Sequence, residues 1–299
     1  MARALWLFVL ASCGSHHEAA PPAPPPPKPA PVVVAKKPVD APKPIKHVVI
    51  ISEDGMRPDV LTDELAPHHV ALMKEGAIAH HAQTIPESDT LPSHASMLSG
   101  VGARAHGLWW NSFQATRGFI HVPTIFSAAH DAHLSTAMIV GKPKLKHIAA
   151  PGTVDHYERP SYLCGGVAKR AAEYIASDAP ALLFVHFSDP DEYGHSHGWM
   201  SPEYKRAVKN SDACLATVLG AIDPDDTLVI VTADHGGHGM KHSDGHFAVD
   251  RDIPWIVRGP NIGHGITLDH DVDTEDTAAT TLAALGLPAL PHMVGHPAI

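Results

Sequence analysis

The strongest constraint on the fold is a short apolar run, Thr227–Thr232, which stops abruptly at the pair Asp234-His235. Its length and its β-branched residues predict a strand buried on both faces of a parallel sheet. Ligands of open α/β sheets bind beyond the carboxyl ends of the strands, where Asp234 and His235 would lie. Carboxylate oxygens and imidazole nitrogens are ligands that suit zinc. The run therefore predicts both a sheet and a metal-binding edge of that sheet.

Two further apolar runs end in carboxylates in the same way. His47–Ser52 is followed by Asp54, and Ala181–Phe187 leads to Asp191, with His195 four residues later. A lone aspartate before glycine is usually a turn, but the repeated pattern favours a shared site. Helical segments alternate with these runs. The chain is therefore predicted to form an α/β fold, a three-layer α/β/α sandwich with a mostly parallel central sheet.

The carboxylates that follow the strands should meet at one edge of the sheet. There they would repel one another unless a cation lay between them. Three histidines complete a set of six oxygen and nitrogen donors: Asp54, Asp191, His195, Asp234, His235 and His242. Six donors are enough for two zinc ions with open positions, spaced by roughly 4 Å.

A helix is predicted from Thr90 to about Leu98, with Pro92 in its first turn, where a missing backbone donor costs nothing. The Thr90 hydroxyl would then face free N–H groups at the positive end of the helix dipole. That position suits a group that attacks an anionic phosphate. Taken alone, a threonine at this place is more often a simple helix cap.

Three polar side chains are candidates for binding a phosphate oxygen. Asn111 ends a loop after His106-Gly107, and Lys142 and Lys144 follow a predicted strand over Ser135–Val140. The alternative for Asn111 is an ordinary Asx turn, and for the lysines it is contact with water alone.

At these residues the sequence resembles the alkaline phosphatase superfamily, most closely the type I phosphodiesterase/nucleotide pyrophosphatase family. The resemblance extends over most of the chain from Lys46 onward. The matching pieces are Asp54-Gly55, Thr90-Leu91-Pro92-Ser93-His94, His106-Gly107 through Asn111, Pro190 through His195, and Asp234-His235-Gly236.

The resemblance implies two zinc ions and a small phosphate-ester substrate. It assigns one ion to Asp191, His195 and a later histidine, which we place at His242, with His246 as the alternative. It assigns the other ion to Asp54, Asp234 and His235, together with the oxygen of Thr90. By the same likeness Thr90 is the nucleophile and forms a phosphothreonine, while Asn111 binds a non-bridging phosphate oxygen.

The favoured interpretation is thus a zinc-dependent phosphodiesterase or nucleotide pyrophosphatase. A phosphomonoesterase is the alternative, because Lys142-Pro143-Lys144 resembles the Lys-x-Arg pair of threonine-dependent monoesterases in the superfamily. That likeness makes Lys142 a candidate catalytic residue. A sulfatase is disfavoured, since its Cys/Ser-x-Pro-x-Arg signature is missing at Thr90. A non-catalytic lipoprotein that binds phosphate ligands is disfavoured because the nucleophile and the ligands are all present.

The amino terminus predicts export and a lipid anchor. Residues 1–12 contain a short apolar core that is too short to span a bilayer, and they resemble a lipoprotein signal peptide that ends before Cys13. Residues 13–45 are proline-rich and predict a semi-rigid tether to a catalytic domain over residues 46–299. We therefore expect a lipidated Cys13 and a place at the bacterial cell envelope, on the outer membrane or the periplasmic face. A cleaved signal with an incidental cysteine is the alternative.

Charge and cysteine content limit the remaining partners. The net charge of −10 with neutral histidines argues against nucleic-acid binding. Cys164 and Cys214 could form a disulfide in an oxidising envelope or remain buried thiols, and the sequence favours neither. No pattern in the sequence indicates an oligomeric state.

Overall fold

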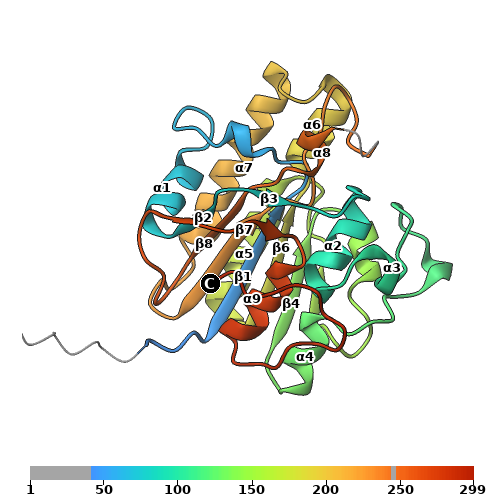
Figure 1. Ribbon diagram of the computed structural model, residues 1–299, viewed down its shortest axis with the longest axis vertical. Coiled ribbons are helices and arrows are strands. Elements are labelled where there is room, and N and C mark those ends of the chain that lie inside the picture. The colour runs from blue at the N-terminus through green and yellow to red at the C-terminus, as the bar shows by residue number, and fades with distance from the viewer. Residues whose placement is uncertain (1–41, 244–246) are drawn as a thin grey trace, which may run out of the picture. The chain divides into compact units, whose positions relative to one another are not determined.

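Strand β1 (His47–Glu53) lies at the centre of the fold, between β6 (Leu182–Phe187) and β7 (Thr227–Thr232), and runs parallel to both. The computed structural model describes residues 42–243 and 247–299 (Figure 1), and residues 42–299 form one compact unit. Within the described residues the main sheet has eight strands in the order β5-β4-β6-β1-β7-β8-β2-β9. Its remaining strands are β2 (Ala77–Ala79), β4 (Thr136–Val140), β5 (His156–Glu158), β8 (Trp255–Arg258) and β9 (Ile266–Leu268).

The sheet is mostly parallel, as predicted. Only β8 reverses direction, so it pairs antiparallel with β7 on one side and with β2 on the other. A separate small sheet joins β3 (Ala82–Gln83) to β10 (Val272–Asp273). Pro254 directly precedes β8, an interior strand.

Helices cover both faces of the main sheet and complete the predicted three layers. Contacts and core clusters place α1, α5 and α7 on one face and α2, α4 and α9 on the other. The helices are α1 (Pro67–Glu75), α2 (Thr90–Ser99), α3 (Ala103–His106), α4 (Ile125–Asp131), α5 (Cys164–Asp178), α6 (Asp189–His197), α7 (Pro202–Leu219), α8 (Ala248–Arg251) and α9 (Asp276–Ala284). Short 3-10 turns are η1 (Pro58–Val60), η2 (Ala115–Arg117) and η3 (Pro143–His147).

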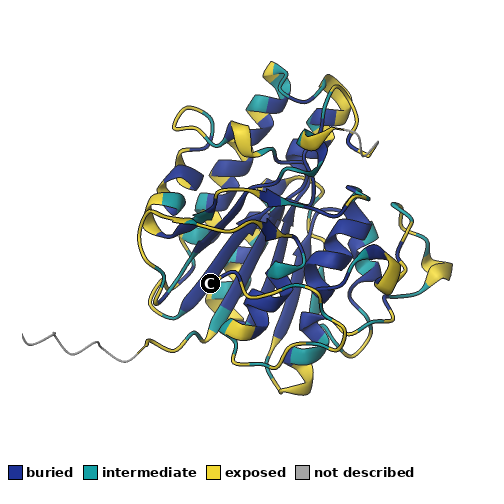
Figure 2. Cartoon of the chain, viewed as in Figure 1, coloured by how far each residue is buried: buried dark blue, intermediate teal, exposed yellow. Residues whose placement is uncertain are grey.

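Successive side chains of β1 point to opposite faces of the sheet, which explains why two hydrophobic cores form. Val48 and Ile50 join the core beneath α2 and α9, whereas Val49 and Ile51 join the core beneath α5 and α7. All four side chains are at most 3% exposed, and Figure 2 shows the central strands almost entirely buried. Apolar side chains on both faces are typical of a parallel strand between two helical layers, and they make the sheet a rigid base for the residues at its carboxyl edge.

Local signals set the ends of the helices nearest this edge. Helix α2 begins at Thr90 and ends at Gly100, whose φ of 71° is the left-handed conformation of a helix C-cap. Helix α7 begins after Ser201, whose hydroxyl accepts a hydrogen bond from the Tyr204 amide, and Pro202 occupies its first position. The segment after β6, for which the sequence predicted no helix, forms α6.

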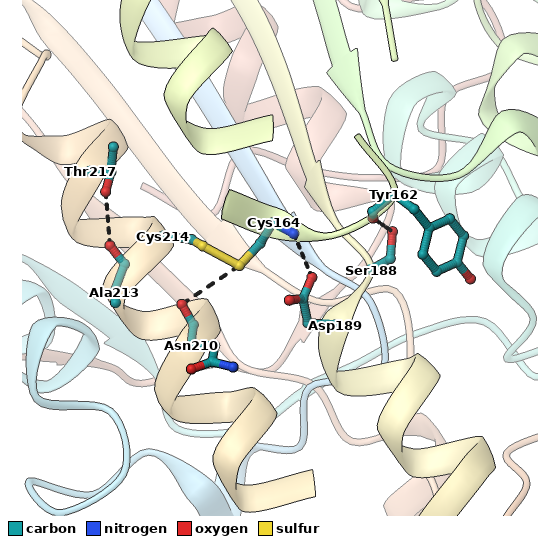
Figure 3. The surroundings of a disulfide bond; sticks show 8 residues. All are labelled: Tyr162, Cys164, Ser188, Asp189, Asn210, Ala213, Cys214 and Thr217. Atoms are coloured by element: carbon teal, nitrogen blue, oxygen red, sulfur yellow. Dashed lines mark hydrogen bonds between the residues drawn. A yellow bond between two sulfur atoms is a disulfide. The ribbon is translucent and has the colours of Figure 1, made fainter. Parts of the chain in front are cut away.

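Cys164 and Cys214 form a disulfide that joins the start of α5 to α7 (Figure 3). This resolves the alternative that the sequence left open. The Cys164 amide also donates a hydrogen bond of 2.7 Å to Asp189 Oδ2, at the start of α6. The Ser188 hydroxyl donates to the Tyr162 carbonyl at 2.8 Å. The disulfide therefore lies next to the turn that leads into α6.

The predicted signal peptide and Cys13 lie outside the described residues, as does nearly all of the predicted tether over residues 13–45. In residues 42–243 and 247–299, no helix is both long enough and apolar enough to cross a membrane.

Candidate active site

The carboxyl ends of β1, β6 and β7 interlock through backbone hydrogen bonds. The Asp54 amide donates to the Phe187 carbonyl, and the Asp191 amide donates to the Asp54 carbonyl, both at 2.9 Å. Gly55 has a φ of 70° and lies so close to α6 that a Cβ atom there would be 2.9 Å from Asp191 Cα. Its amide donates to Asp234 Oδ1 at 3.2 Å. A glycine is therefore required here, and it draws the three predicted carboxylates together.

The first metal group consists of Asp54, Asp234 and His235, whose donor atoms lie within 4.8 Å of one another. All three side chains are completely buried. His235 Nε2 lies 3.3 Å from Asp54 Oδ1 and 3.4 Å from Asp234 Oδ2. The other ring nitrogen, Nδ1, donates to the Gly236 carbonyl at 2.8 Å. That bond leaves Nε2 as a lone-pair donor directed at the two carboxylates.

The second metal group consists of Asp191, His195 and His242, again with donor atoms within 4.8 Å. Asp191 and His195 are one turn apart on α6, so both face the same way, and His195 Nε2 lies 3.3 Å from Asp191 Oδ1. Both histidines donate from Nδ1 to carbonyls, His195 to Met240 at 3.0 Å and His242 to Ser88 at 2.7 Å. Their Nε2 atoms lie 3.1 Å apart and share a hydrogen bond, and both are directed into the group.

Unpartnered atoms in the two groups fit a bound cation. Among residues 42–243 and 247–299, four buried donor atoms of the groups have no hydrogen-bond partner: Asp54 Oδ1, Asp191 Oδ1, Asp234 Oδ2 and His235 Nε2. Burying such atoms without a partner is unfavourable. Three oxygen and nitrogen ligands with room for a fourth are typical of a catalytic zinc site. The residues present therefore suit metal ions at both groups.

The charges of the site also favour a bound cation. Burial and the nearby Asp54 carboxylate raise the pKa of Asp234 to about 7. Burial by itself would also raise the pKa of Asp54, but the Lys142 ammonium and a hydrogen bond from His186 outweigh it and hold that pKa well below its ordinary value. Carboxylates this close need positive charge among them.

Thr90 begins α2, and residues close to it in the chain contact both metal groups. Its hydroxyl is buried and has no hydrogen-bond partner in the described part of the chain. One turn further along α2, His94 Nδ1 lies 3.4 Å from Asp234 Oδ2 of the first group. On the other side, the preceding Ser88 bonds His242 of the second group through both its hydroxyl and its carbonyl. The hydroxyl thus lies at a helix N-terminus whose neighbouring residues contact both groups, and it makes no hydrogen bond within the described residues.

Asn111 and Lys144 form a polar pair at the start of α2. Asn111 Oδ1 accepts hydrogen bonds from the Leu91 amide at 3.1 Å and from Lys144 Nζ at 2.9 Å. Its amide nitrogen donates to Asp89 Oδ1 at 3.2 Å. Both side chains are partly exposed.

Lys142 is placed differently from Lys144. Its side chain is 5% exposed, and its ammonium donates to Asp54 Oδ2 at 2.7 Å and to Asp191 Oδ2. It therefore contacts one carboxylate from each metal group. Of the remaining histidine candidates, His238 bonds Asp250 and belongs to neither group, and His246 lies outside the described residues.

Sequence reasoning missed a layer of buried polar residues behind the metal groups. His186, inside β6, bonds Asp54 Oδ2 through Nε2 at 2.9 Å. His94 Nδ1 donates to the Thr90 carbonyl at 2.7 Å and its Nε2 accepts from the Ser52 hydroxyl at 2.8 Å. A polar residue within an apolar strand, directly before the strand ends, was the one signal that could have indicated His186.

Comparison with known proteins identifies a matching family. The family model "Type I phosphodiesterase / nucleotide pyrophosphatase" matches residues 48–259. A bis(5'-adenosyl)-triphosphatase of Xenopus laevis is 25% identical over 211 residues, which cover 63% of this chain and 46% of that protein. A 2,3-bisphosphoglycerate-independent phosphoglycerate mutase of Nostoc punctiforme is 25% identical over 217 residues, 69% of this chain and 39% of that protein. The chain thus spans less than half the length of either relative.

Solved structures with the same fold include murine ectonucleotide pyrophosphatase/phosphodiesterase 5. The TM-score is 0.70 at 16% identity, with 82% of this chain and 96% of that chain covered. A putative sulfatase from Bacteroides thetaiotaomicron aligns with a TM-score of 0.71 at 17% identity, covering 86% of this chain and 74% of that chain. These likenesses confirm the predicted α/β architecture with its mostly parallel sheet.

Proposed function

Because the chain belongs to the type I phosphodiesterase/nucleotide pyrophosphatase family, we propose that it is a zinc-dependent hydrolase of phosphodiester or pyrophosphate bonds that acts through a phosphothreonine at Thr90. The observation that carries the proposal is the buried, unpartnered Thr90 hydroxyl at the start of α2, flanked by two groups of metal-ligating side chains. The similarity to a bis(5'-adenosyl)-triphosphatase supports the inclusion of phosphoric anhydride bonds.

Two zinc ions are the metals that fit these ligands best. The alkaline phosphatase superfamily is metal-dependent, and each group here offers three oxygen or nitrogen atoms of the kind that zinc binds. Asp54, Asp234 and His235 would hold one ion, and Asp191, His195 and His242 the other. Bound zinc would lower the pKa of the Thr90 hydroxyl and stabilise negative charge on the oxygens around phosphorus.

The residues of the chain then perform a two-step transfer. Thr90 Oγ1 gives its proton to solvent and attacks phosphorus in line, the bond to the leaving oxygen breaks, that oxygen takes up a proton from solvent, and a phosphothreonine ester remains. Water then attacks the same phosphorus, the bond from phosphorus to Thr90 Oγ1 breaks, and a proton of the water returns to Oγ1. The positive end of α2 and the Asn111–Lys144 pair face the phosphate oxygens during both steps. Catalysis of this kind depends chiefly on positioning and on charge stabilisation.

Phosphomonoester hydrolysis is the second candidate, and Lys144 is the observation that favours it. Its ammonium lies 2.9 Å from Asn111 Oδ1, at the open side of the site. A monoester carries one more negative charge than a diester, so an extra cation beside the phosphate favours the monoester.

A paired assay separates the two candidates. The zinc-loaded protein would be given bis(4-nitrophenyl) phosphate and 4-nitrophenyl phosphate, and kcat/KM compared for the two. The leading proposal predicts faster turnover of the diester. Faster turnover of the monoester would replace it with the second candidate, and absence of turnover of both would favour a phosphate-binding protein without activity.

The same protein is proposed to be tethered to the bacterial cell envelope. The support is the order of signal-like residues, Cys13 and a proline-rich stretch at the start of the sequence. A lipid on Cys13 would hold the catalytic domain at the outer membrane or on the periplasmic face of the envelope. The variant Cys13→Ser should move the protein from the membrane pellet to the soluble fraction after cell lysis. Retention of the variant in the pellet would refute lipidation as the anchor.

A further inference from the structure

In both Asp54 and Asp191, the two carboxylate oxygens contact different partners. Asp54 Oδ1 faces His235 of its own metal group at 3.3 Å, and Asp191 Oδ1 faces His195 of its group, also at 3.3 Å. Both Oδ1 atoms are buried and have no hydrogen-bond partner among the residues that the structure describes. The Oδ2 atoms point the other way, and both accept hydrogen bonds from the single ammonium of Lys142.

Lys142 therefore contacts both metal groups, through the carboxylate oxygens that face away from the histidines of those groups. Its ammonium contacts Asp54 of the first metal group and Asp191 of the second, and its side chain is 5% exposed. Lys144, two residues later, is partly exposed and bonds Asn111 instead. The intervening Pro143 begins η3, so the two lysines leave the backbone in different environments.

The backbone that carries Lys142 is held in place by close packing. A Cβ atom at Gly141 would lie 2.1 Å from Ser188 Oγ and 2.6 Å from the Tyr162 carbonyl oxygen. The end of β4 is thus pressed against the turn that leads into α6, where Asp191 lies. The Gly141 amide also donates to the His186 carbonyl at 3.1 Å. These contacts leave Lys142 little freedom to turn toward the open side of the site.

We propose that Lys142 is a positioning residue rather than a phosphate contact: it is an internal counter-ion that binds one carboxylate of each metal group and couples the two metal sites. The inference rests on the proposed function only in assuming that the two groups bind cations. By holding the Oδ2 atoms, the ammonium keeps each Oδ1 turned toward the histidines of its group. It also places a positive charge beside both carboxylates and holds them in place before metal binds.

The counter-ion role has a distinctive energetic consequence. Without metal, Lys142→Met would leave two buried carboxylates unpaired, and the loss of one partner of a buried ion pair changes the folding equilibrium by roughly a hundredfold or more. With zinc bound, the metal charge compensates those same carboxylates, so the loss should be smaller. By linkage, a smaller loss with zinc means that zinc stabilises the folded variant more than it stabilises the folded wild type. The variant should therefore depend on zinc more than the wild type does.

The test compares melting temperatures of the wild type, Lys142→Met and Lys144→Met, each with zinc and with a chelator, and phosphate binding by calorimetry with zinc. Lys142→Met should lower the Tm by on the order of 10 °C in chelator and by less than half of that with zinc. Its affinity for inorganic phosphate should stay within about threefold of the wild type. Lys144→Met should show the opposite pattern, with both Tm values unchanged and phosphate affinity reduced by about tenfold or more.

Three results would overturn the inference. Equal Tm losses with and without zinc would make Lys142 a packing residue, and a loss of phosphate affinity as large as that of Lys144→Met would make it a phosphate contact. Failure of zinc to raise the Tm of the wild type would refute the metal sites, and with them the proposed function. If Lys142→Met does not fold even with zinc, Lys142→Arg replaces it. Because that variant keeps the charge, it should retain most of the wild-type Tm in chelator, and a loss as large as 10 °C would contradict the counter-ion role.

Discussion

The buried hydroxyl of Thr90 is the group on which the proposed chemistry depends. It has no hydrogen-bond partner in the described residues although its side chain is 1% exposed. An ordinary capping threonine would use its oxygen to accept an amide of its own helix, whereas the N-cap position here is Asp89 and the Thr90 oxygen accepts no such bond. Its oxygen is thus free to bind a cation and to attack phosphorus.

Replacing Thr90 with alanine should remove activity without removing metal. We expect Thr90→Ala to lower kcat by about a thousandfold or more, because the attacking oxygen is lost, while zinc measured by mass spectrometry stays near that of the wild type. Thr90→Ser, which keeps a hydroxyl, is the matched control and should retain a substantial fraction of the activity. Activity of Thr90→Ala within tenfold of the wild type would rule out Thr90 as the nucleophile.

Individual residues of the site differ in how well a sequence can predict them. Asp54 and Asp234 could be predicted because each follows a buried strand, and His195 because it comes four residues after Asp191, beyond a third strand that ends in carboxylates. His186 was missed because a histidine inside an apolar strand mostly has the pattern of an ordinary core residue, and its position directly before the strand end is only a weak signal. Its role depends on the Oδ2 atom of Asp54, which β1 brings from far along the sequence.

At the scale of elements, α6 is where the sequence prediction was incomplete. The segment after β6 contains Pro190 and Gly194, which both lower helix propensity, and the sequence analysis assigned no helix to it. The structure has a helix because Pro190 lies in its first turn, where proline is tolerated, and because Gly194 packs against Trp199. A Cβ atom at Gly194 would lie 2.6 Å from the indole ring. Tertiary packing of this kind is not visible in local sequence patterns.

The loop that carries Asn111 is held by His147 at the end of η3. His147 Nδ1 donates to the Gly118 carbonyl at 2.5 Å, and its Nε2 accepts from the Gln114 amide at 3.0 Å. We predict that His147→Phe, which keeps a ring but loses both hydrogen bonds, lowers kcat/KM by roughly tenfold, because Asn111 is no longer held against the phosphate. Zinc content should not change.

The control for this prediction is His147→Gln, whose amide can still donate and accept. It should recover part of the activity lost in His147→Phe. If both variants hydrolyse substrate within twofold of the wild type, the loop does not need His147 to place Asn111.

A buried charge network ties α1 and α7 to the end of β1, and it predicts a pH dependence of stability. His69 bonds Asp212 Oδ1 at 2.7 Å and Glu53 Oε2 at 2.8 Å. Burial alone would lower its pKa, but the two carboxylates outweigh burial and raise the pKa to about 9. Because the folded-state pKa lies above the unfolded value, the stabilisation is complete below about pH 6.5 and is lost as pH rises through 9.

We therefore expect the contribution of His69 to the free energy of unfolding to fall by roughly 3 kcal/mol between pH 6.5 and 9.5. Urea unfolding of the wild type and of His69→Gln at both pH values measures it. The difference between the two proteins should be large at pH 6.5 and small at pH 9.5. A difference that does not change with pH would show that His69 is not charged in the folded state.

At the scale of the whole molecule, the sequence predicted the layers and the parallel sheet. Buried strands that alternate with helices are enough for that inference. It did not predict the order of the strands or the disulfide. Cys164 and Cys214 are 50 positions apart in the sequence, and only the packing of α5 against α7 brings them together (Figure 3).

Removing the disulfide should destabilise the whole domain. Closing a loop of 50 residues is expected to contribute about 4 kcal/mol to the free energy of unfolding. The double variant Cys164→Ser/Cys214→Ser, measured by urea unfolding, should lose about that much, and a reducing agent should produce the same loss in the wild type. An unchanged urea midpoint in the double variant would mean that the disulfide adds no net stability.

The central claim is that two metal ions at the carboxyl edge of the sheet act with Thr90 in one active site. The most direct test is the rate of nitrophenol release from bis(4-nitrophenyl) phosphate as zinc is added stepwise to metal-free protein. If the claim is correct, the metal-free protein is inactive and the rate rises until two zinc ions are bound per chain, then stays constant. Full activity without metal, or a plateau at one zinc per chain, would contradict it.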